Sequence, residues 1–575
     1  MITRKQFSVA SSILTAFVLM LSVSQGLDFS DMGYSLSKYR FVFEPACGTF
    51  SAGLALSEIV GGVVGLLSGW GSVLVFKLAF AVLTLLTAGL AVRLLKIKLT
   101  GSIMGGMLLA ILIAGFDMQW IGYYNLTAVS LLAVAGAVCL SVWKRSLVWL
   151  GVAFFLTVMA GCVRLPNLLI VVLPGVAVFR LGRFFPVIRV LLHAMAGGGL
   201  AIGLALAVLV ASGQFESFVS QMSGVAATAA GSGSYGVGTL IRKLGGELLR
   251  SVGLALLMLA GWYAAGRISS AWFRVVAIGL PHVVTVVAYI GLSLDGSVVN
   301  LEFYPVYHLV ALVMATFIAG WHHVRAEARF LALLSCVVMV VSALGSMRAL
   351  TVMLYGFWLA VPLAQYFGMA VLRKAYGIGG LARCVVSVIY VPALCMAIFF
   401  AWTHNFRESP HRQNLTCPMQ DAVFSGVFTS RERASAVDGL MAQLRSVGKK
   451  YTSLLQCNDL PLVHFLVGLP PFAGILWYQT HAEADLALRL GKTVSGGLPL
   501  VVRHTSPAED RSWPARDDDG GRAVRKRKGS QLKRQLLLDF CERNHYEVTW
   551  TDGYFEVLEP RRMARKRSIL QSIRD

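Results

Sequence analysis

The residues best suited to chemistry in this chain are a few charged side chains in an otherwise apolar sequence. Asp28 and Asp31 lie within residues 27–39, directly after an apolar stretch. A carboxylate at the end of a membrane helix can act as a general base that deprotonates an acceptor hydroxyl, or as a metal ligand. It can equally cap a short helix at the membrane surface, and the residues alone leave these roles open. Asp31 and Asp28 are therefore the catalytic candidates.

Cations at unusual places form a second set of candidates. Arg164 follows an apolar stretch on what we expect to be the outer side, where the charge bias of membrane proteins does not favour a cation. Binding a phosphate and pairing with an outside carboxylate would each explain it. Arg242 and Lys243 follow a Gly/Ser-rich segment, 224–238, which predicts a mobile outside loop. Such a loop can close over a lipid substrate, and a plain flexible linker is the alternative.

The composition indicates which part of the chain lies in a membrane and which part lies in water. The chain has 575 residues, of which 56% are hydrophobic and 14% charged, and its mean hydropathy is +0.69. Soluble domains carry about 25% charged residues, so a purely soluble enzyme is excluded. Residues 1–402 hold 25 basic and 10 acidic residues, whereas residues 403–575 hold 26 and 19. The net charge of +22 therefore indicates a membrane domain, 1–402, and a soluble domain, 403–575, rather than a nucleic-acid partner.

Hydrophobic runs and the positive-inside rule predict the topology. A span needs about 20 apolar residues, and Lys and Arg of short loops favour the cytoplasm. The segment 54–67 is expected to lie along the outer surface, because spanning would put Arg93, Lys96 and Lys98 outside. Residues 7–24 are expected to form an uncleaved first helix, with a signal peptide as the alternative. The expected spans are 7–24, 72–92, 102–116, 124–142, 147–163, 167–181, 187–211, 249–266, 272–293, 304–321, 328–345, 349–370 and 384–402.

These thirteen spans give a consistent charge distribution. They place 17 basic residues of the membrane part inside and 8 outside, and 9 of its 10 acidic residues outside. An odd number of spans that starts inside leaves the N-terminus in the cytoplasm and residues 403–575 outside. The predicted fold class is an α-helical polytopic membrane protein with a C-terminal soluble α/β extracytoplasmic domain.

The tail shows mixed helical and strand patterns. Residues 430–447 have the apolar spacing of an amphipathic helix, and 498–503 is a short apolar strand. Two alternating segments, 546–550 and 554–558, flank a Thr-Asp-Gly turn, which predicts a hairpin. The polar segment 506–530 predicts a mobile loop. The basic end of the chain is either a solvated tail or a contact for anionic lipid headgroups.

The spacing of the nine cysteines does not indicate a structural zinc site, because they form no CxxC pair and show no His/Cys ligand spacing. Cys417 and Cys457 lie in the tail. They could form a disulfide in an oxidising compartment, and two unpaired thiols are the alternative.

Several short motifs, taken together, resemble the GT-C glycosyltransferases. The expected arrangement is similar to that of the protein-mannosyltransferase and aminoarabinose-transferase branch. It shares with that branch an Asp-centred first outside loop, a surface-lying helix, a basic residue (Lys77) at the start of the next span, about a dozen spans and an extracytoplasmic tail. The matching segments are Asp31-Met32-Gly33-Tyr34-Ser35-Leu36, which resembles a D-x-G-[YF]-x-L form of Bacteroidetes-type members, Trp120-Ile121-Gly122-Tyr123-Tyr124-Asn125, Val163-Arg164-Leu165-Pro166-Asn167, Leu344-Gly345-Ser346 and residues 405–412.

This resemblance implies a transferase that moves a sugar from a polyprenyl-phosphate donor to an acceptor glycan, lipid or protein outside the cytoplasm. The enzyme would sit in a bacterial inner membrane with its tail in the periplasm. Many members carry Asp-Glu in the first loop, and here Met32 follows Asp31, which leaves the need for a divalent cation open. No metal ligand is assigned. The residues that the resemblance implies for substrate binding are Asp117, Tyr123, Asn125, Arg164, Lys77, Arg242 and Lys243. For Asp117, a plain interfacial position among belt aromatics is the alternative.

Two other functional classes fit a protein with many spans. A transporter or flippase of lipid-linked saccharides would place ionisable residues near the midplane and show internal repeats. The predicted span interiors are almost free of charge, and the sequence shows no repeat. A non-catalytic partner in envelope-glycan assembly would use the tail as its functional part. Such a partner would be indifferent to replacement of Asp31.

Overall fold

The fold is described from a computed structural model of the 575-residue chain. The structure describes residues 23–98, 104–114, 118–231, 237–294, 304–346, 349–374, 412–491, 497–505 and 528–561, with residues 17, 19–21, 376, 393–395, 397–399 and 408. The expected spans 7–24 and 384–402 and the expected loop 506–530 lie largely outside the described residues, as does Asp117.

The chain divides into two compact units that do not follow the predicted boundary at residue 402. One, the membrane unit, holds residues 1–21, 80–208 and 221–404. The other, the tail unit, holds residues 22–79, 209–220 and 405–575. The loop that carries Asp28 and Asp31 therefore belongs to the same unit as the C-terminal segment.

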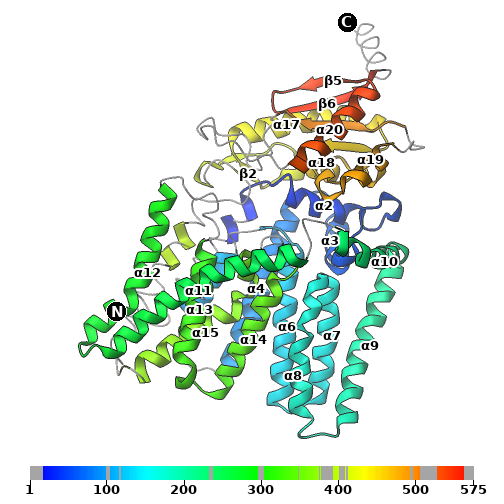
Figure 1. Ribbon diagram of the computed structural model, residues 1–575. Coiled ribbons are helices and arrows are strands. Elements are labelled where there is room, and N and C mark those ends of the chain that lie inside the picture. The colour runs from blue at the N-terminus through cyan, green and yellow to red at the C-terminus, as the bar shows by residue number, and fades with distance from the viewer. Residues whose placement is uncertain are drawn as a thin grey trace. The chain divides into compact units, whose positions relative to one another are not determined.

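The membrane unit is helical, and most of its α-helices are labelled in Figure 1. Helices α4 and α10 begin in the tail unit, and α9 ends there. The helices are α4 (Val73–Lys98), α5 (Met104–Ala114), α6 (Tyr123–Trp143), α7 (Leu147–Val163), η3 (Leu165–Val171), α8 (Val172–Leu181), α9 (Val187–Ala211), α10 (Phe215–Gly231), α11 (Val237–Arg267), α12 (Ala271–Leu294), α13 (Tyr304–Gly320), η5 (Trp321–His323), α14 (Ala326–Ala343), η6 (Ala349–Gly356) and α15 (Phe357–Lys374).

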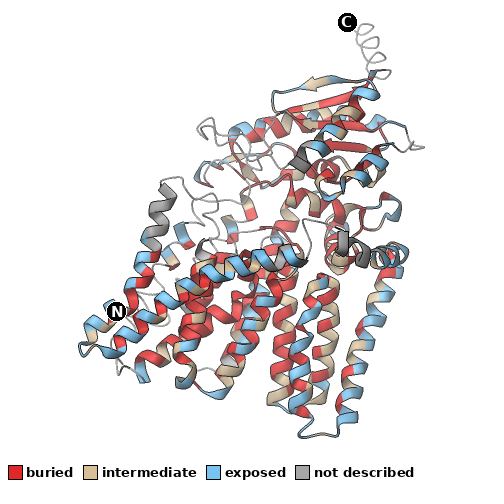
Figure 2. Cartoon of the chain, in the orientation of Figure 1, coloured by how far each residue is buried: buried red, intermediate tan, exposed pale blue. Residues whose placement is uncertain are grey.

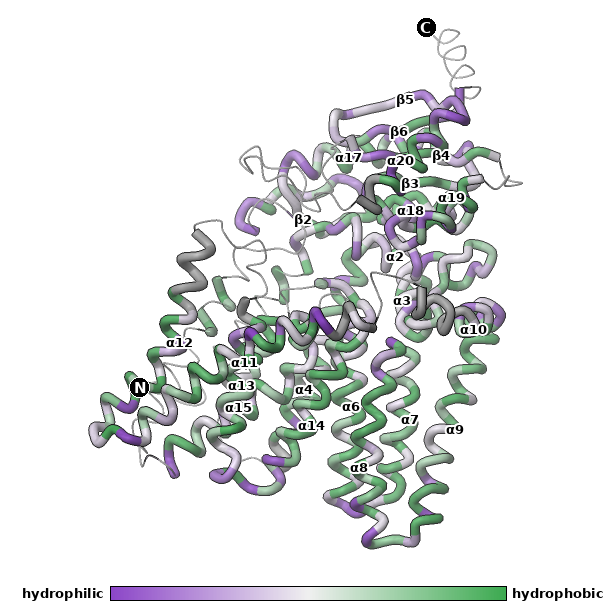
Figure 3. The backbone as a smooth tube through the Cα atoms, in the orientation of Figure 1, coloured by the Kyte–Doolittle hydropathy of each residue, from purple (hydrophilic) through white to green (hydrophobic). Residues whose placement is uncertain are grey.

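Seven helices within the described residues are long and apolar enough to cross a membrane. Several of them carry exposed large apolar side chains; on α9, for example, Met195 is 71% and Leu200 is 68% exposed. Figure 2 shows this exposure along α9, and Figure 3 shows the hydrophobic colour over α6, α7, α8 and α9. Contiguous apolar surface of this kind is stable against lipid rather than water. The predicted count of thirteen spans is not confirmed.

Two predicted segments differ from what the structure shows. Residues 224–231, expected to be loop, continue helix α10 to Gly231. Four alanines in this stretch favour the helix. The expected span 167–181 is divided into η3 and α8, and Pro166 lies in the first turn of η3. The pyrrolidine ring suits a first turn, where its missing N–H would have no partner.

The N-terminal part of the tail unit contains two short helices, α2 (Asp31–Phe41) and α3 (Ala55–Leu67), with the 3-10 turns η1 (Pro45–Cys47) and η2 (Ala52–Leu54). Thirteen residues make α3 about 20 Å long, less than the roughly 30 Å of a bilayer core. Its length agrees with the prediction that residues 54–67 do not span. Val63, Leu66 and Leu67 form its exposed apolar side.

The C-terminal part of the tail unit is a mixed α/β domain. A four-stranded sheet has the order β3-β4-β6-β5, in which β3 and β4 are parallel and the other pairs antiparallel. A two-stranded sheet pairs β1 with β2. The elements are η7 (Arg412–Asn414), β1 (Cys417–Pro418), η8 (Ala422–Phe424), β2 (Phe428–Thr429), α17 (Arg431–Val447), η9 (Gly448–Lys450), β3 (Leu454–Cys457), α18 (Leu462–Val467), η10 (Phe472–Gly474), η11 (Tyr478–Thr480), α19 (Glu483–Gly491), β4 (Leu500–His504), α20 (Lys528–Arg543), β5 (Tyr546–Thr551) and β6 (Phe555–Pro560).

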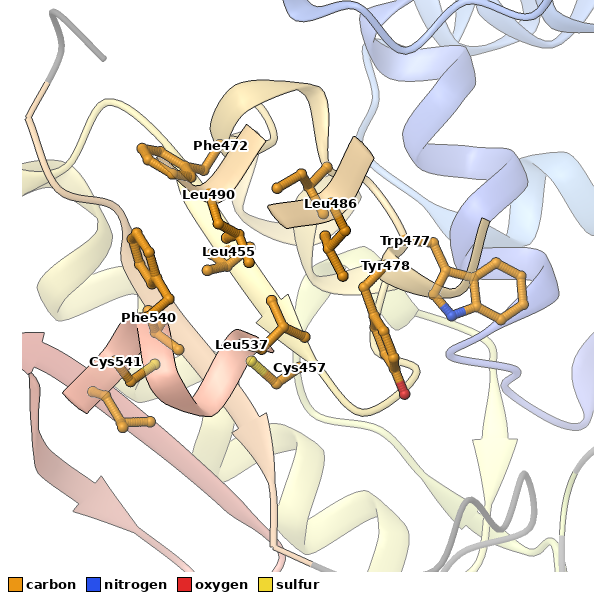
Figure 4. Packing of buried hydrophobic residues seen from close by; sticks show 13 residues of the cluster. Leu455, Cys457, Phe472, Trp477, Tyr478, Leu486, Leu490, Leu537, Phe540 and Cys541 are labelled. Atoms are coloured by element: carbon orange, nitrogen blue, oxygen red, sulfur yellow. The ribbon is translucent and has the colours of Figure 1, made fainter. Parts of the chain in front are cut away.

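A hydrophobic core joins the sheet to its helices. Figure 4 shows Leu455 and Cys457 of β3 among Leu486 of α19 and Phe540 of α20. Tyr34, from helix α2, packs against the same core. The predicted fold class, a helical polytopic membrane domain followed by an α/β domain, is confirmed. The predicted tail helix and hairpin correspond to α17 and to β5–β6.

Candidate functional site

The carboxylate of Asp28 accepts hydrogen bonds from nearby main-chain N–H groups of the tail unit. It is 5% exposed, and its Oδ1 accepts hydrogen bonds from the main-chain N–H of Ser30 (2.9 Å) and from Ser30 Oγ (2.7 Å). Its Oδ2 accepts a bond of 2.8 Å from the N–H of Met32, in the first turn of α2. Helices begin with N–H groups that have no internal partner, and an acidic side chain satisfies them. Asp28 thus holds the entry to α2.

Asp31 occupies a different position, as the first residue of α2, and it is partly exposed. A carboxylate at a helix N-terminus is stabilised by the helix dipole. Two residues later, a Cβ on Gly33 would lie 2.3 Å from the main-chain nitrogen of Leu462, so only glycine permits this approach of α2 to α18. The structure therefore gives Asp28 a structural contact and leaves Asp31 partly accessible beside a tightly packed glycine.

Helix α2 is fixed on α18 by hydrogen bonds as well as by packing. Ser37 Oγ donates to the carbonyl of Pro461 (2.7 Å) and accepts from the N–H of Phe465 (3.0 Å). The N–H of Leu462 donates to the carbonyl of Phe29 (3.1 Å). These bonds join segments more than 400 residues apart in sequence, and so they position the first loop by means of the C-terminal domain.

A buried ion pair on the same helix was not anticipated from the sequence. Lys38 and Glu58 are 4% and 2% exposed, and Lys38 Nζ lies 2.8 Å from Glu58 Oε1. Glu58 also accepts a bond from the N–H of Ser51 (2.9 Å), and the ammonium lies 4.6 Å from the centre of the Tyr34 ring. Burial opposes the charge on Lys38, but Glu58 and Tyr34 outweigh it and raise the pKa of Lys38 above its ordinary value.

The signal for this pair was present but ambiguous. Lys38 lies seven residues after Asp31, on the same side of a helix, and Glu58 is the single acid of the apolar segment 55–67. Neither spacing identified the other partner, because the two residues belong to different helices. Asp31, Tyr34 and Lys38 form a polar stripe along α2, and these three residues with Asp28 and Glu58 are called the α2 cluster.

Lys77 is buried in the tail unit and is held by main-chain oxygens. Its Nζ donates to the carbonyls of Gln25 and Gly26, both at 2.7 Å, and the side chain is 2% exposed. Two of the three N–H donors of the ammonium are therefore used. Its charged neighbours are Glu408, Arg412 and Asp28.

Glu408 and Arg433 form a second buried charge contact in the tail unit. Arg433 Nη1 lies 3.5 Å from Glu408 Oε1, and the two side chains are 1% and 0% exposed. Glu408 also accepts a bond of 2.7 Å from the N–H of Leu27, next to Asp28, and another from Thr429 Oγ1. Glu408 and Arg412 lie in the tail segment that carried part of the resemblance, but the sequence assigned them no role.

Arg164 lies in the membrane unit, and its described contacts are main-chain carbonyls and an aromatic ring. Its Nη1 donates to the carbonyl of Ser342 (2.9 Å) and its Nη2 to that of Leu344, at the C-terminal end of α14. The guanidinium lies 5.5 Å from the centre of the Tyr124 ring. Carbonyls at a helix end have no internal partner, and a cation there also complements the helix dipole. Arg164 therefore serves helix α14, at 4% exposure.

Three motifs singled out in the sequence meet around this arginine. Tyr124 Oη lies 2.9 Å from Ser346 Oγ, and the Tyr124 ring stacks on Tyr355 at 5.1 Å. Gly345 has φ of +70°, and a Cβ there would lie 2.5 Å from Pro166 Cγ. Tyr124, Arg164, Gly345 and Ser346 are called the Arg164 cluster.

The other predicted binding residues of the membrane unit have different environments. Tyr123 is half-buried and packs against Tyr124 with ring centres 4.2 Å apart. Asn125 is 6% exposed, and its Oδ1 has no hydrogen-bond partner among the described residues. Arg242 and Lys243 are exposed on helix α11. The structure brings none of these four into contact with Arg164 among the interactions it describes.

Metal-ligating and thiol groups are dispersed. In the part of the chain that the structure describes, no three His, Cys, Asp or Glu side chains converge on a common point. Cys417 and Cys457 are unpaired thiols on β1 and β3. Burial raises the pKa of the Cys457 thiol, which disfavours its reactive thiolate form.

Comparison with known proteins gives a likeness among solved structures. No family model and no curated protein matches the chain. Among solved structures, the chain is similar to the crystal structure of ArnT from Cupriavidus metallidurans in the apo state, with 12% identity and a TM-score of 0.46, over 96% of this chain and 98% of that chain. ArnT is an aminoarabinose transferase of the GT-C class, the branch that the sequence motifs resemble. A likeness at this identity and score transfers no activity and no residue's role.

Proposed function

We propose that this protein is a membrane glycosyltransferase. It moves a sugar from a polyprenyl-phosphate donor to an acceptor glycan, lipid or protein on the extracytoplasmic face of a bacterial inner membrane. Asp31 acts as the general base. The proposal rests on the motif resemblance and on the α2 cluster, and the orientation rests on the distribution of basic residues in the sequence.

The observation that supports Asp31 as the base is that it is more exposed than Asp28. Asp28 already accepts three hydrogen bonds and is 5% exposed, so it is a poor proton acceptor for a substrate. Asp31 is partly exposed at the first turn of α2. A general base must come within hydrogen-bond distance of the proton that it abstracts, and of these two carboxylates Asp31 is the accessible one.

The proposed reaction balances as a displacement at the anomeric carbon. The acceptor hydroxyl loses its proton to the Asp31 carboxylate as its oxygen bonds to the sugar. The bond between the sugar and the donor phosphate breaks, and the electron pair leaves with polyprenyl phosphate. The charge that develops on the leaving phosphate requires a fixed cation. We keep Lys77 in this role, as the resemblance implies; because its ammonium donates to the carbonyls of Gln25 and Gly26 and is 2% exposed, contact with the phosphate requires this loop to move.

The proposal also includes secondary contacts of the donor or the acceptor, namely Arg242, Lys243, Tyr123, Asn125 and Asp117. Arg242 and Lys243 are exposed cations on α11, which suits a charged lipid headgroup. Arg164 is the least suited of the predicted phosphate ligands, because the structure uses its guanidinium at the end of α14.

The experiment compares two substitutions that change the charge and keep the shape. Asp31→Asn should lower sugar transfer at least a hundredfold, since a general base contributes about 10²–10⁴ in rate. Asp28→Asn is the matched control. Asn caps helices about as well as Asp, so its loss should be much smaller. Transfer is measured from radiolabelled polyprenyl-phosphate sugars by purified variants that elute normally in size-exclusion chromatography.

The outcomes separate the competing functions. Full activity of Asp31→Asn with an inactive Asp28→Asn would move the base to Asp28. Full activity of both variants would remove the catalytic role of this loop. A wild-type protein that binds the lipid-linked sugar without transferring it would favour the transporter or the assembly partner.

A further inference from the structure

Two consecutive residues after strand β3 have a backbone conformation that side chains disfavour. Asn458 and Asp459 have φ of 67° and 60°. The left-handed region is unfavourable for a residue with a side chain, and Asn and Asp tolerate it best. Strain of this kind persists where the surroundings impose it, and it concentrates at functional sites.

A network of buried side chains imposes this conformation. Gln456, which is fully buried, accepts a bond of 3.0 Å from the N–H of Leu460 and donates one of 3.2 Å to the carbonyl of Leu476. Asn458 Nδ2 donates to the carbonyl of His504 at 2.7 Å. The loop is thus fixed from both sides, and its shape turns the Asp459 side chain toward a neighbouring segment of the tail unit.

Asp459 holds two side chains of that segment. Its Oδ1 accepts a bond of 2.6 Å from Trp477 Nε1, and its Oδ2 accepts one of 3.0 Å from Gln479 Nε2. Trp477 is 8% exposed, and its ring centre lies 5.4 Å from that of Tyr34 in α2. Figure 4 shows the Trp477 ring directed away from the core side chains of the sheet.

The contacts continue from Trp477 into the α2 cluster. Tyr34 carries the Lys38 ammonium 4.6 Å from its ring centre, and Lys38 pairs with Glu58. The same loop also supplies Pro461, whose carbonyl accepts the hydroxyl of Ser37. Asp459 therefore lies at one end of a continuous series of contacts that reaches the helix on which Asp31 stands.

We propose that Asp459 is a positioning residue for helix α2. By accepting from Trp477 and Gln479 it fixes the indole against Tyr34, and so sets the orientation of the helix that presents Asp31. The strained loop is the device that brings the carboxylate to Trp477. The catalytic consequence rests on the proposed function, whereas the ordering of α2 does not.

The test starts with Asp459→Asn. Asn tolerates φ near 60° and keeps one oxygen that can accept from Trp477. Its amide nitrogen, however, would face Gln479 Nε2, and two N–H donors cannot form a hydrogen bond with each other. We expect kcat to fall about ten- to a hundredfold, the effect of one lost hydrogen bond to a charged group, with the KM for the donor changed less than twofold. Adding Gln479→Glu reverses the donor and the acceptor and should restore kcat.

Further variants separate positioning from stability. Asp459→Gly and Asp459→Ala both remove the carboxylate, but only the glycine relieves the backbone strain, so its thermal midpoint should fall less than that of Asp459→Ala while kcat falls equally in both. Asp438→Asn is the matched control. This half-buried carboxylate of α17 accepts bonds from the N–H groups of Gln420 and Asp421, and its replacement should leave kcat unchanged.

Hydrogen exchange gives a readout that does not need activity. Peptides from residues 31–41 should exchange faster in Asp459→Asn than in the wild type, and peptides from residues 431–447 should not. If the wild type transfers no sugar, the proposed function fails and the exchange data still decide the inference. Wild-type exchange in α2 and wild-type kcat in Asp459→Asn would overturn it.

Discussion

The α2 cluster and the Arg164 cluster use charge in opposite ways. In the Arg164 cluster, the guanidinium donates to two main-chain carbonyls at the end of α14, and the surrounding tyrosines and glycine pack closely about it. In the α2 cluster, Asp28 accepts from main-chain N–H groups, Lys38 and Glu58 pair with each other, and Asp31 is partly exposed. Both clusters carry motifs of the same resemblance.

The contrast shows that a rare charge in an apolar chain is not by itself evidence of a binding role. A helix end in a low-dielectric environment leaves carbonyls without partners, and each unsatisfied group is costly. Arg164 satisfies two such groups. In the α2 cluster, Lys38 and Glu58 pair with each other and Asp28 binds the backbone, whereas Asp31 is partly exposed at the first turn of the helix. Three experiments test this contrast.

The largest effect is expected from Lys38→Met, which leaves Glu58 buried without its cation. Removing one partner of a buried pair typically costs about 3–5 kcal/mol. The thermal midpoint of the purified protein should therefore fall markedly, and peptides from α2 and α3 should become accessible to protease before those of the membrane unit. A midpoint unchanged from the wild type would mean that the pair does not support the α2 cluster.

The matched control is the double variant Lys38→Met with Glu58→Leu, which replaces both charges by apolar groups of similar size. Such replacements are often neutral or stabilising. The double variant should therefore recover most of the lost stability, and because Asp31 is retained it should recover transfer as well. Failure to recover would assign Lys38 a role beyond its partner.

The second effect concerns pH and His464 of α18, the helix on which α2 packs. Burial lowers the pKa of His464 to about 4, below its ordinary value of 6.5. As the pH falls below 6.5, His464 is protonated in the unfolded chain but stays neutral in the folded protein. The contribution of His464 to the free energy of unfolding is therefore fully present above pH 6.5 and is lost as the pH falls toward 4. The loss amounts to roughly 3 kcal/mol. Thermal midpoints of the wild type should fall across this range more than those of His464→Gln, and equal slopes would contradict the assignment.

The smallest effect is expected in the Arg164 cluster. Arg164→Ala should lower stability by about 2 kcal/mol, the contribution of hydrogen bonds to a charged group, and Arg164→Lys should lower it less. The KM for the donor should change less than twofold in both. A tenfold rise of the KM for the donor in Arg164→Ala, with an unchanged thermal midpoint, would indicate that Arg164 binds the donor phosphate.

Local patterns were sufficient for part of the fold and for one feature of the site. Apolar runs predicted most helices of the membrane unit within a few residues, because a span is defined by its own composition. Ser430 begins helix α17 and accepts the N–H of Arg433, as its position before an amphipathic pattern suggests. The hairpin around Asp552 followed from its turn residues. Asp28 and Asp31 were both candidates because they follow an apolar stretch, and the motif resemblance favoured Asp31; its catalytic role stays a prediction.

The tertiary structure decided which charges are available and which are structural. Lys38 meets Glu58, Leu27 meets Glu408 across 381 residues, and Asp459 reaches α2 through Trp477. No periodicity identifies such partners, because each pair joins elements whose faces are set by packing elsewhere. The sequence by itself determined a membrane domain, a mixed α/β tail and an acidic first loop. Only the folded chain assigned Asp28 to the backbone, Arg164 to a helix end and Asp31 to a partly exposed first turn, since hydrogen bonding and burial exist only once distant segments have come together.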